Sequence, residues 1–102
     1  RPDLVVMNPP FKLAQEFCET ALAHVAPGGE VAALMRLSML ESAKRETFWR
    51  RYAHADVYVL GKRPSFTGGS TDSCAYAWFV WREGRQGSQG RWFRLGSEPA
   101  LG

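Results

Sequence analysis

Four consecutive residues, Asn8, Pro9, Pro10 and Phe11, carry groups that could activate a planar amine. The exocyclic amine of adenine is a poor nucleophile because its lone pair is delocalised into the ring. Acceptors that hold its two N–H groups out of the ring plane return the lone pair to the nitrogen, and the Asn8 side-chain carbonyl and the Pro9 backbone carbonyl are suitable acceptors. The two prolines restrict the backbone, so both acceptors are positioned before any reaction.

Phe11 completes the predicted catalytic group by offering an apolar face on which a base could stack. Stacking of this kind is worth roughly 1–3 kcal/mol per base, which can offset the few kcal/mol needed to flip a base out of a duplex. No neighbouring side chain is a convincing general base, and none is required, because the ammonium formed by methylation loses its proton to water. The tetrapeptide therefore predicts a site in which an amine attacks the methyl group of a methyl sulfonium and becomes methylated.

The flanking sequence predicts elements that would hold this tetrapeptide at one edge of a sheet. The apolar run at residues 4–7 predicts a short parallel strand buried on both faces, which ends at the prolines because proline cannot donate to the sheet ladder. Residues 12–26 predict an amphipathic helix packed on the sheet. Its apolar stripe comprises Leu13, Ala14, Phe17, Cys18, Ala21, Leu22 and Val25. Ligands of open α/β sheets bind beyond the carboxyl ends of the parallel strands, which is where the tetrapeptide would lie.

The remaining pattern extends this start into an α/β fold. Pro27, Gly28 and Gly29 form a turn. Further elements are expected as a buried strand at 30–36, a helix through 44–52 capped by Ser38 or Ser42, a strand at 56–60, a turn-rich loop at 61–72 and an aromatic core strand at 75–81. Because no helix separates the last two strands, they should pair antiparallel.

The C-terminal residues change in composition, which suggests a boundary. Residues 83–90 have the composition of a flexible linker, and residues 91–95 could add a short strand. The expected division is a catalytic part at 1–82 and a flexible tail at 83–102. The chain opens on Arg1, Pro2 and Asp3 without an initiator methionine, so we expect it to be cut from a longer protein.

Composition excludes several classes of protein. With 45% apolar and 23% charged residues the chain is typical of a soluble globular domain, and no run approaches the ~20 apolar residues of a membrane helix. A cytoplasmic location and no membrane contact are expected. Cys18 and Cys74 are expected to be buried thiols, and neither they nor His24 and His54 have metal-ligand spacing, so no metal site is expected.

The charge balance permits an anionic partner without requiring one. The net charge is +3 and the pI is about 9.2. Basic residues gather in the middle of the chain, and a solvated helix face is the favoured interpretation of most of them. They are Lys44, Arg45, Arg50, Arg51, Lys62 and Arg63.

Residues 3–11 resemble the catalytic strand and motif of class I adenosylmethionine-dependent methyltransferases that act on amino nitrogens. The motif is shared by DNA adenine-N6, ribosomal guanine-N2 and protein glutamine-N5 enzymes. Residues 40–42, 48–49, 57–60, 63–68, 71–73 and 76–81 look like phage and prophage DNA adenine methyltransferases. The resemblance implies the C-terminal half of a Rossmann-like sheet, in the order first, second, fourth, third strand, with the fourth antiparallel.

The same resemblance implies a cofactor, a partner and further site residues. S-adenosylmethionine would be the cofactor, with Asn8 and Pro9 beside it, and duplex DNA with a flipped adenine would be the partner. The residues expected beside the target base are Arg36, Arg63, Ser65, Phe66 and Thr67.

One departure from that family is large, because the Gly-rich loop and the acidic ribose-binding residue that should precede this segment are not in the chain. We therefore expect a missing N-terminal half of the same enzyme, a chain inactive alone, and an unpaired edge at the first strand. Two alternatives stay open: a methyltransferase for RNA guanine-N2 or protein glutamine-N5, and an inactive fragment that serves as an interaction module.

Overall fold

The computed structural model describes residues 1–41, 43–60 and 75–95. Its elements are strand β1 (Leu4–Met7), 3-10 helix η1 (Phe11–Leu13), helix α1 (Ala14–His24), strand β2 (Glu30–Arg36), 3-10 helices η2 (Leu37–Leu40) and η3 (Ala43–Arg45), helix α2 (Glu46–Arg51), and strands β3 (Asp56–Leu60), β4 (Tyr76–Arg82) and β5 (Trp92–Leu95). None of these helices is both long and apolar enough to cross a membrane.

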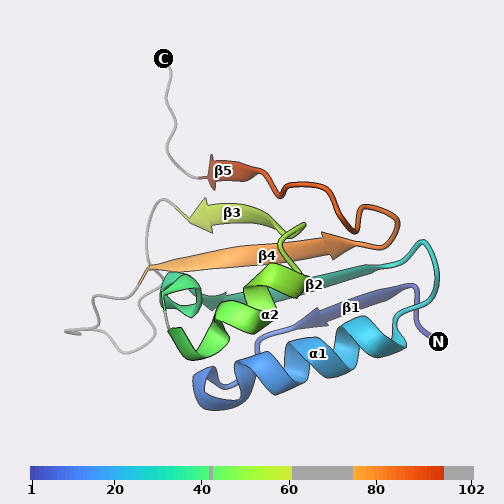
Figure 1. Cartoon of the computed structure of the whole chain (residues 1–102), viewed down its shortest axis with the longest axis horizontal. Helices are drawn as coiled ribbons and strands as arrows, with labels where there is room; N and C mark the ends of the chain where they lie inside the picture. The colour runs from blue at the N-terminus through green and yellow to red at the C-terminus, as the bar shows by residue number, and fades with distance from the viewer. Residues whose placement is uncertain (42, 61–74, 96–102) are drawn as a thin grey trace.

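The five strands form one mixed sheet in the order β1-β2-β4-β3-β5 (Figure 1). β1 and β2 pair parallel, while β4 runs antiparallel to both of its neighbours. The predicted α/β class, the strand order and the antiparallel fourth strand are therefore confirmed. β5 adds to the far edge in parallel with β3, at the place where the sequence suggested a short strand. The division at residue 82 stays a prediction.

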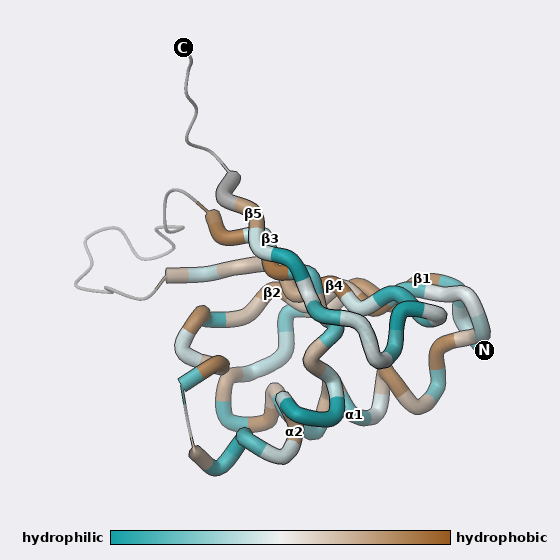
Figure 2. The backbone as a smooth tube through the Cα atoms, turned by 45° about the horizontal axis from the view of Figure 1, so that its top comes forward, coloured by the Kyte–Doolittle hydropathy of each residue, from teal (hydrophilic) through white to brown (hydrophobic). Residues whose placement is uncertain are grey.

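Both helices cover the same face of the sheet, as Figure 2 shows from the side. The prediction that β1 and β2 are buried on both faces is therefore wrong. In β2 every second residue is buried, and in β1 Leu4 and Val6 are 56% and 60% exposed. The reason is that the described part of the chain supplies no layer for the second face, so a continuous apolar run still has one side open.

The aromatic strand β4 supplies the centre of the core. Phe79 and Trp81 are buried, and Phe48 of α2 meets Trp81 edge to face at 6.1 Å between ring centroids. The Trp81 indole N–H donates to the Tyr52 carbonyl at 2.9 Å, so its polar group is satisfied inside the core. Trp78 points to the other face and is only half-buried, so the expected aromatic core holds for alternate residues of the strand.

The helices begin later than the sequence pattern predicted, and the buried face of α1 consists of fewer residues than predicted. η1 takes up the beginning of the expected first helix, and Leu13 and Phe17 are 48% and 44% exposed rather than packed. The buried face of α1 is built from Ala14, Cys18 and Ala21. Small side chains on this face let the helix approach the sheet closely, which turns the larger residues outward.

The predicted serine cap of the second helix is also incorrect for Ser38. That residue lies inside η2, and α2 begins after Arg45, which makes no side-chain cap hydrogen bond. Ser42, the other predicted cap, lies outside the described residues.

A buried acid holds the far edge of the sheet together. The side chain of Asp56 is 2% exposed and contacts the guanidinium of Arg82 at 2.6 Å and that of Arg91 at 3.0 Å, while Arg85 lies at 4.0 Å. The Arg91 backbone N–H donates to the same carboxylate at 2.9 Å. Burial raises the pKa of Asp56, but the hydrogen bonds and charge of Arg91 and the charge of Arg82 outweigh burial, so the pKa lies below its ordinary value.

Gly90 allows the same segment to approach β3. Its backbone N–H donates to the Ala53 carbonyl at 3.1 Å, and a Cβ at this position would overlap the Ala55 carbonyl oxygen. The chain can therefore pass this close only with glycine.

Candidate functional site

The Asn8–Phe11 segment turns the chain from the end of β1 into η1. Asn8 is exposed directly after the strand, and Pro9 is buried. Pro10 has φ −60° and ψ 140°, an extended conformation that proline favours, and its carbonyl accepts a hydrogen bond from the Leu13 N–H at 3.0 Å. Pro10 therefore shapes the turn and begins η1.

The two acceptors proposed from the sequence remain available. Within the described residues, neither the Asn8 side chain nor the Pro9 carbonyl takes part in a hydrogen bond. Backbone carbonyls in folded proteins are usually satisfied, so an available acceptor beside a cavity is a place for a ligand donor.

A small cavity lies beside these acceptors at the carboxyl ends of β1 and β2. Its volume is about 110 Å³. It is lined by Asn8, Pro9, Phe11, Ala14, Leu34, Met35, Arg36 and Tyr76. A cavity of about 150 Å³ accommodates benzene, so this one could hold the amino edge of a purine and not the whole base.

Two arginines lie over the ring of Phe11. The Arg36 guanidinium carbon is 5.0 Å from the ring centroid, and that of Arg45 is 4.8 Å away. Such cation–π contacts are worth roughly 0.5–1 kcal/mol at exposed sites, against roughly 1–3 kcal/mol for a base stacked on an aromatic ring. A base could therefore displace one guanidinium from Phe11, or stack on it.

The structure brings together some of the predicted site residues. Asn8, Pro9, Phe11 and Arg36 line one cavity, whereas Pro10 does not. The other residues expected beside the base lie outside the described residues: Arg63, Ser65, Phe66 and Thr67. The catalytic, substrate-binding and cofactor-binding roles remain predictions.

Two residues at this end of the sheet were not assigned to it from the sequence. Tyr76 was assigned to the core strand, but it pairs with Arg36 at the start of β4 and lines the cavity. The antiparallel direction of β4 was the available signal, since its first residue must meet the last residue of β2. Arg45 was read as part of a solvated helix face, and no sequence signal linked it to Phe11.

Comparison with known proteins supports the fold. No protein family and no curated protein matches the sequence. Among solved structures, the chain is similar to a predicted O-methyltransferase from Agrobacterium tumefaciens, with 23% sequence identity and a TM-score of 0.54. The match covers 92% of this chain and 42% of that protein. The chain therefore shares the mixed α/β fold of a part of that protein.

No second reactive centre is evident in the described ranges. They contain no group of three or more metal-ligating side chains. Cys18 is fully buried, as expected, and burial raises the pKa of its thiol to about 12, so it stays protonated and unreactive. His24 is exposed on α1, and its ring nitrogen lies 2.8 Å from the Thr20 carbonyl. Cys74 lies outside the described residues.

Proposed function

We propose that this chain forms the target-base part of an S-adenosylmethionine-dependent methyltransferase that modifies the N6 amine of adenine in DNA. The observation that carries the proposal is the pair of available acceptors, the Asn8 amide oxygen and the Pro9 carbonyl, beside a cavity at the carboxyl end of β1. The similarity in fold to a predicted O-methyltransferase supports methyl transfer in general.

The residues would act by binding and orienting the amine. One N–H donates to the Asn8 side-chain oxygen and the other to the Pro9 carbonyl, which draws the nitrogen lone pair out of conjugation. Because Pro9 and Pro10 fix the backbone, the acceptors need no rearrangement when charge develops on the nitrogen. Once the N–C bond had formed and the C–S bond of the methyl sulfonium had broken with its electron pair left on sulfur, the extra proton would leave to water, so none of the neighbouring side chains has to act as a base.

S-adenosylmethionine, the usual cofactor of methyltransferases with this fold, would supply the electrophilic methyl group. The cavity of about 110 Å³ cannot enclose that molecule, so the residues present fit only its methyl end, beside Asn8 and Pro9. The other contacts would come from polypeptide outside this chain. The chain spans 42% of the O-methyltransferase that it resembles, which leaves room for such a segment.

An amine acceptor is favoured over an oxygen acceptor. A hydroxyl has one proton and gains nothing from a second acceptor, whereas an amine needs both N–H groups held. The two acceptors at Asn8 and Pro9 match the amine. The choice of adenine in DNA is supported by the resemblance of six short segments between residues 40 and 81 to DNA adenine methyltransferases.

A methyl-transfer assay tests the proposal. The chain, alone and joined to its upstream coding sequence, is incubated with methyl-labelled S-adenosylmethionine and duplex DNA, structured RNA or protein. We expect the joined form to label N6 of adenine in DNA. Label in RNA or protein without label in DNA would overturn the substrate, and no label in any of the three would overturn the activity.

Substitution of Asn8 tests the assigned mechanism. Removing one preorganised polar contact to a developing charge typically costs about 10²–10³ in rate, so Asn8→Ala should lose at least that much. Because Asn8 is exposed, the melting temperature should hardly change. Gln86→Ala is the matched control, since it removes an exposed side-chain amide that accepts from Gly84 at the other end of the sheet. Activity retained in Asn8→Ala would refute its role.

A further inference from the structure

The ring of Phe11 gathers cationic groups from separate elements. Arg36 comes from the last residue of β2, and Arg45 from the end of η3, yet their guanidinium carbons lie 5.0 Å and 4.8 Å from the same ring centroid. The two arginines therefore place their guanidinium groups beside the ring of Phe11, which lines the cavity at Asn8. The electrostatic field beside this ring is set by residues far apart in the sequence.

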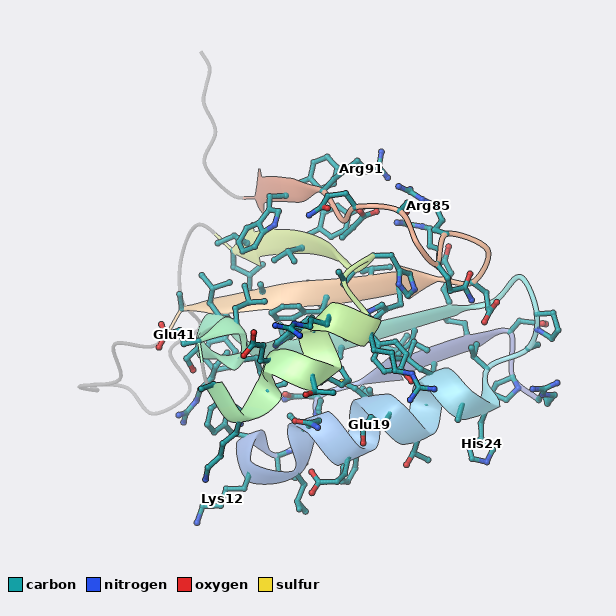
Figure 3. All side chains as sticks on the ribbon, in the orientation of Figure 1. Lys12, Glu19, His24, Glu41, Arg85 and Arg91 are labelled. Carbon is teal, nitrogen blue, oxygen red and sulfur yellow. The ribbon has the colours of Figure 1, made fainter. Side chains whose placement is uncertain are left out.

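A second, larger hollow of about 410 Å³ adjoins Phe11. It is lined by Phe11, Lys12, Gln15, Glu16, Lys44 and Arg45, so three cationic side chains face one carboxylate. Figure 3 shows Lys12 extending outward from this end of the molecule. Glu46, a further acid nearby in sequence, pairs with Arg50 at 2.7 Å.

This hollow lies next to the smaller cavity beside Asn8 and Pro9. Phe11 lines both, so a nucleotide whose base edge enters the smaller cavity would carry its sugar and phosphate toward the larger one. The planar guanidinium of Arg45 can bind phosphate oxygens bidentately, and Lys12 adds a flexible point charge. A pI of about 9.2 fits a nucleic-acid partner better than it fits an acidic peptide bound at one small site.

We propose that Lys12, Lys44 and Arg45 form a rim that binds the phosphodiester backbone of DNA beside the flipped base. The choice of DNA as the source of the phosphates rests on the proposed function; the cationic rim itself does not. Arg36 lies at the boundary between the two hollows, where it would contact the phosphate nearest to the base.

Salt-dependent binding of a labelled oligonucleotide tests the rim. The 102-residue chain is titrated into a fluorescent 20-base-pair DNA duplex, and anisotropy is followed at several salt concentrations. The logarithm of the binding constant falls with the logarithm of the salt concentration by about 0.9 per neutralised phosphate. Arg45→Gln and Lys12→Gln should each lower that slope by about 0.9 and weaken binding roughly three- to tenfold at low salt.

The matched control is Arg51→Gln. Arg51 also lies over an aromatic ring, that of Tyr52 at 5.5 Å, and its loss removes the same charge away from the hollow. It should leave the slope unchanged, while Arg45→Lys should retain the slope of the native chain. If the Arg51 and Arg45 variants lose the same amount of affinity and salt slope, binding depends only on the total charge of the chain and the proposed rim is overturned. A lowered slope in Arg45→Lys would also overturn it.

The arms of the experiment separate this proposal from the proposed function. No methyl donor is present, and Gln86→Ala at the other end of the sheet should bind with the native salt slope. Rim variants that bind normally would overturn the rim even if methyl transfer were found, whereas a lowered slope without any methyl transfer would overturn only the activity. Tighter binding to an RNA duplex of equal length would overturn the commitment to DNA.

Discussion

Arginines gather at both ends of this sheet, but their partners differ. At the far end Arg82, Arg85 and Arg91 surround the buried carboxylate of Asp56, and Arg82 also reaches Glu30 at 3.2 Å. At the end that carries Asn8, Arg45 lies on an aromatic ring, and it makes no ion pair within the described residues. The chain itself balances the charge at the far end, whereas the charge of Arg45 at the Asn8 end has no ion-pair partner within the described residues.

This difference separates stability from function. Asp56 fastens β5 and the preceding turns to β3, so its arginines hold the fold together. A ring such as Phe11 holds a guanidinium by roughly 0.5–1 kcal/mol and leaves most of its charge unneutralised. An arginine can therefore be structural at one end of the sheet and available for binding at the other end.

The largest expected effect on stability is at the far end. Asp56→Ala should lower the free energy of unfolding by about 1–3 kcal/mol, because it leaves Arg82 and the Arg91 N–H without their acceptor. The loss stays below that for a fully buried ion pair because the side chains of Arg82 and Arg91 are 34% and 55% exposed and can be hydrated. Chemical denaturation followed by tryptophan fluorescence measures it.

Glu46→Ala provides the control for that measurement. Glu46 pairs with Arg50 at the helix surface, where both side chains are more than half exposed, so its removal should cost no more than about 0.5 kcal/mol. If the two variants unfold at the same denaturant concentration, the claim that Asp56 fastens the far edge is wrong.

Acidification should lower the free energy of unfolding through Asp56 as well, by less than Asp56→Ala does. Because the pKa of Asp56 is lowered on folding, its contribution to stability is present above its ordinary pKa near 3.8 and is lost as the pH falls through the lower value of the folded state. Denaturation curves between pH 6 and pH 2 should show this loss in the native chain. The loss should be reduced in Asp56→Asn, and an identical pH dependence in both chains would exclude Asp56 as its source.

His54 should make a second pH-dependent contribution to stability, at higher pH than Asp56. Its side chain is buried, and burial lowers the pKa of the imidazole. The folded state therefore resists protonation, and a small part of the stability is lost as the pH falls from the ordinary value near 6.5 toward the lowered one. His54→Gln should remove this loss of stability below pH 6.5 and keep the loss at lower pH that comes from Asp56. If the loss below pH 6.5 is unchanged in the variant, a group other than His54 causes it.

Local patterns predicted much of the fold and the centre of the site. The apolar runs placed the strands, and the prolines after Met7 placed Asn8 at a carboxyl end of the sheet. Burial on one face could not be predicted, because Ala32 and Leu34 are as apolar as the buried Val31 and Ala33, and only the placement of both helices decides between them.

Non-local pairings account for what the sequence did not show. Asp56 meets Arg82 and Arg91, which are 26 and 35 residues away, only because β4 and β5 flank β3. Arg45 meets Phe11 only once η3 folds back over the start of α1. Spacing along the chain carries no sign of such contacts, since a solvated arginine and a site arginine have the same sequence environment.

A small expected effect, that of Arg45→Gln, is also the sharpest test of the comparison. Arg45→Gln removes a cation from the Asn8 end and should change the free energy of unfolding by no more than about 1 kcal/mol, since only its contact with Phe11 is lost. Arg91→Gln removes a cation from the far end and should cost more, because two side-chain contacts to Asp56 go with it. If Arg45→Gln proves the more destabilising, its guanidinium is a structural group and the contrast between the two ends fails. If it leaves stability nearly unchanged while lowering DNA affinity, then this arginine is retained for binding.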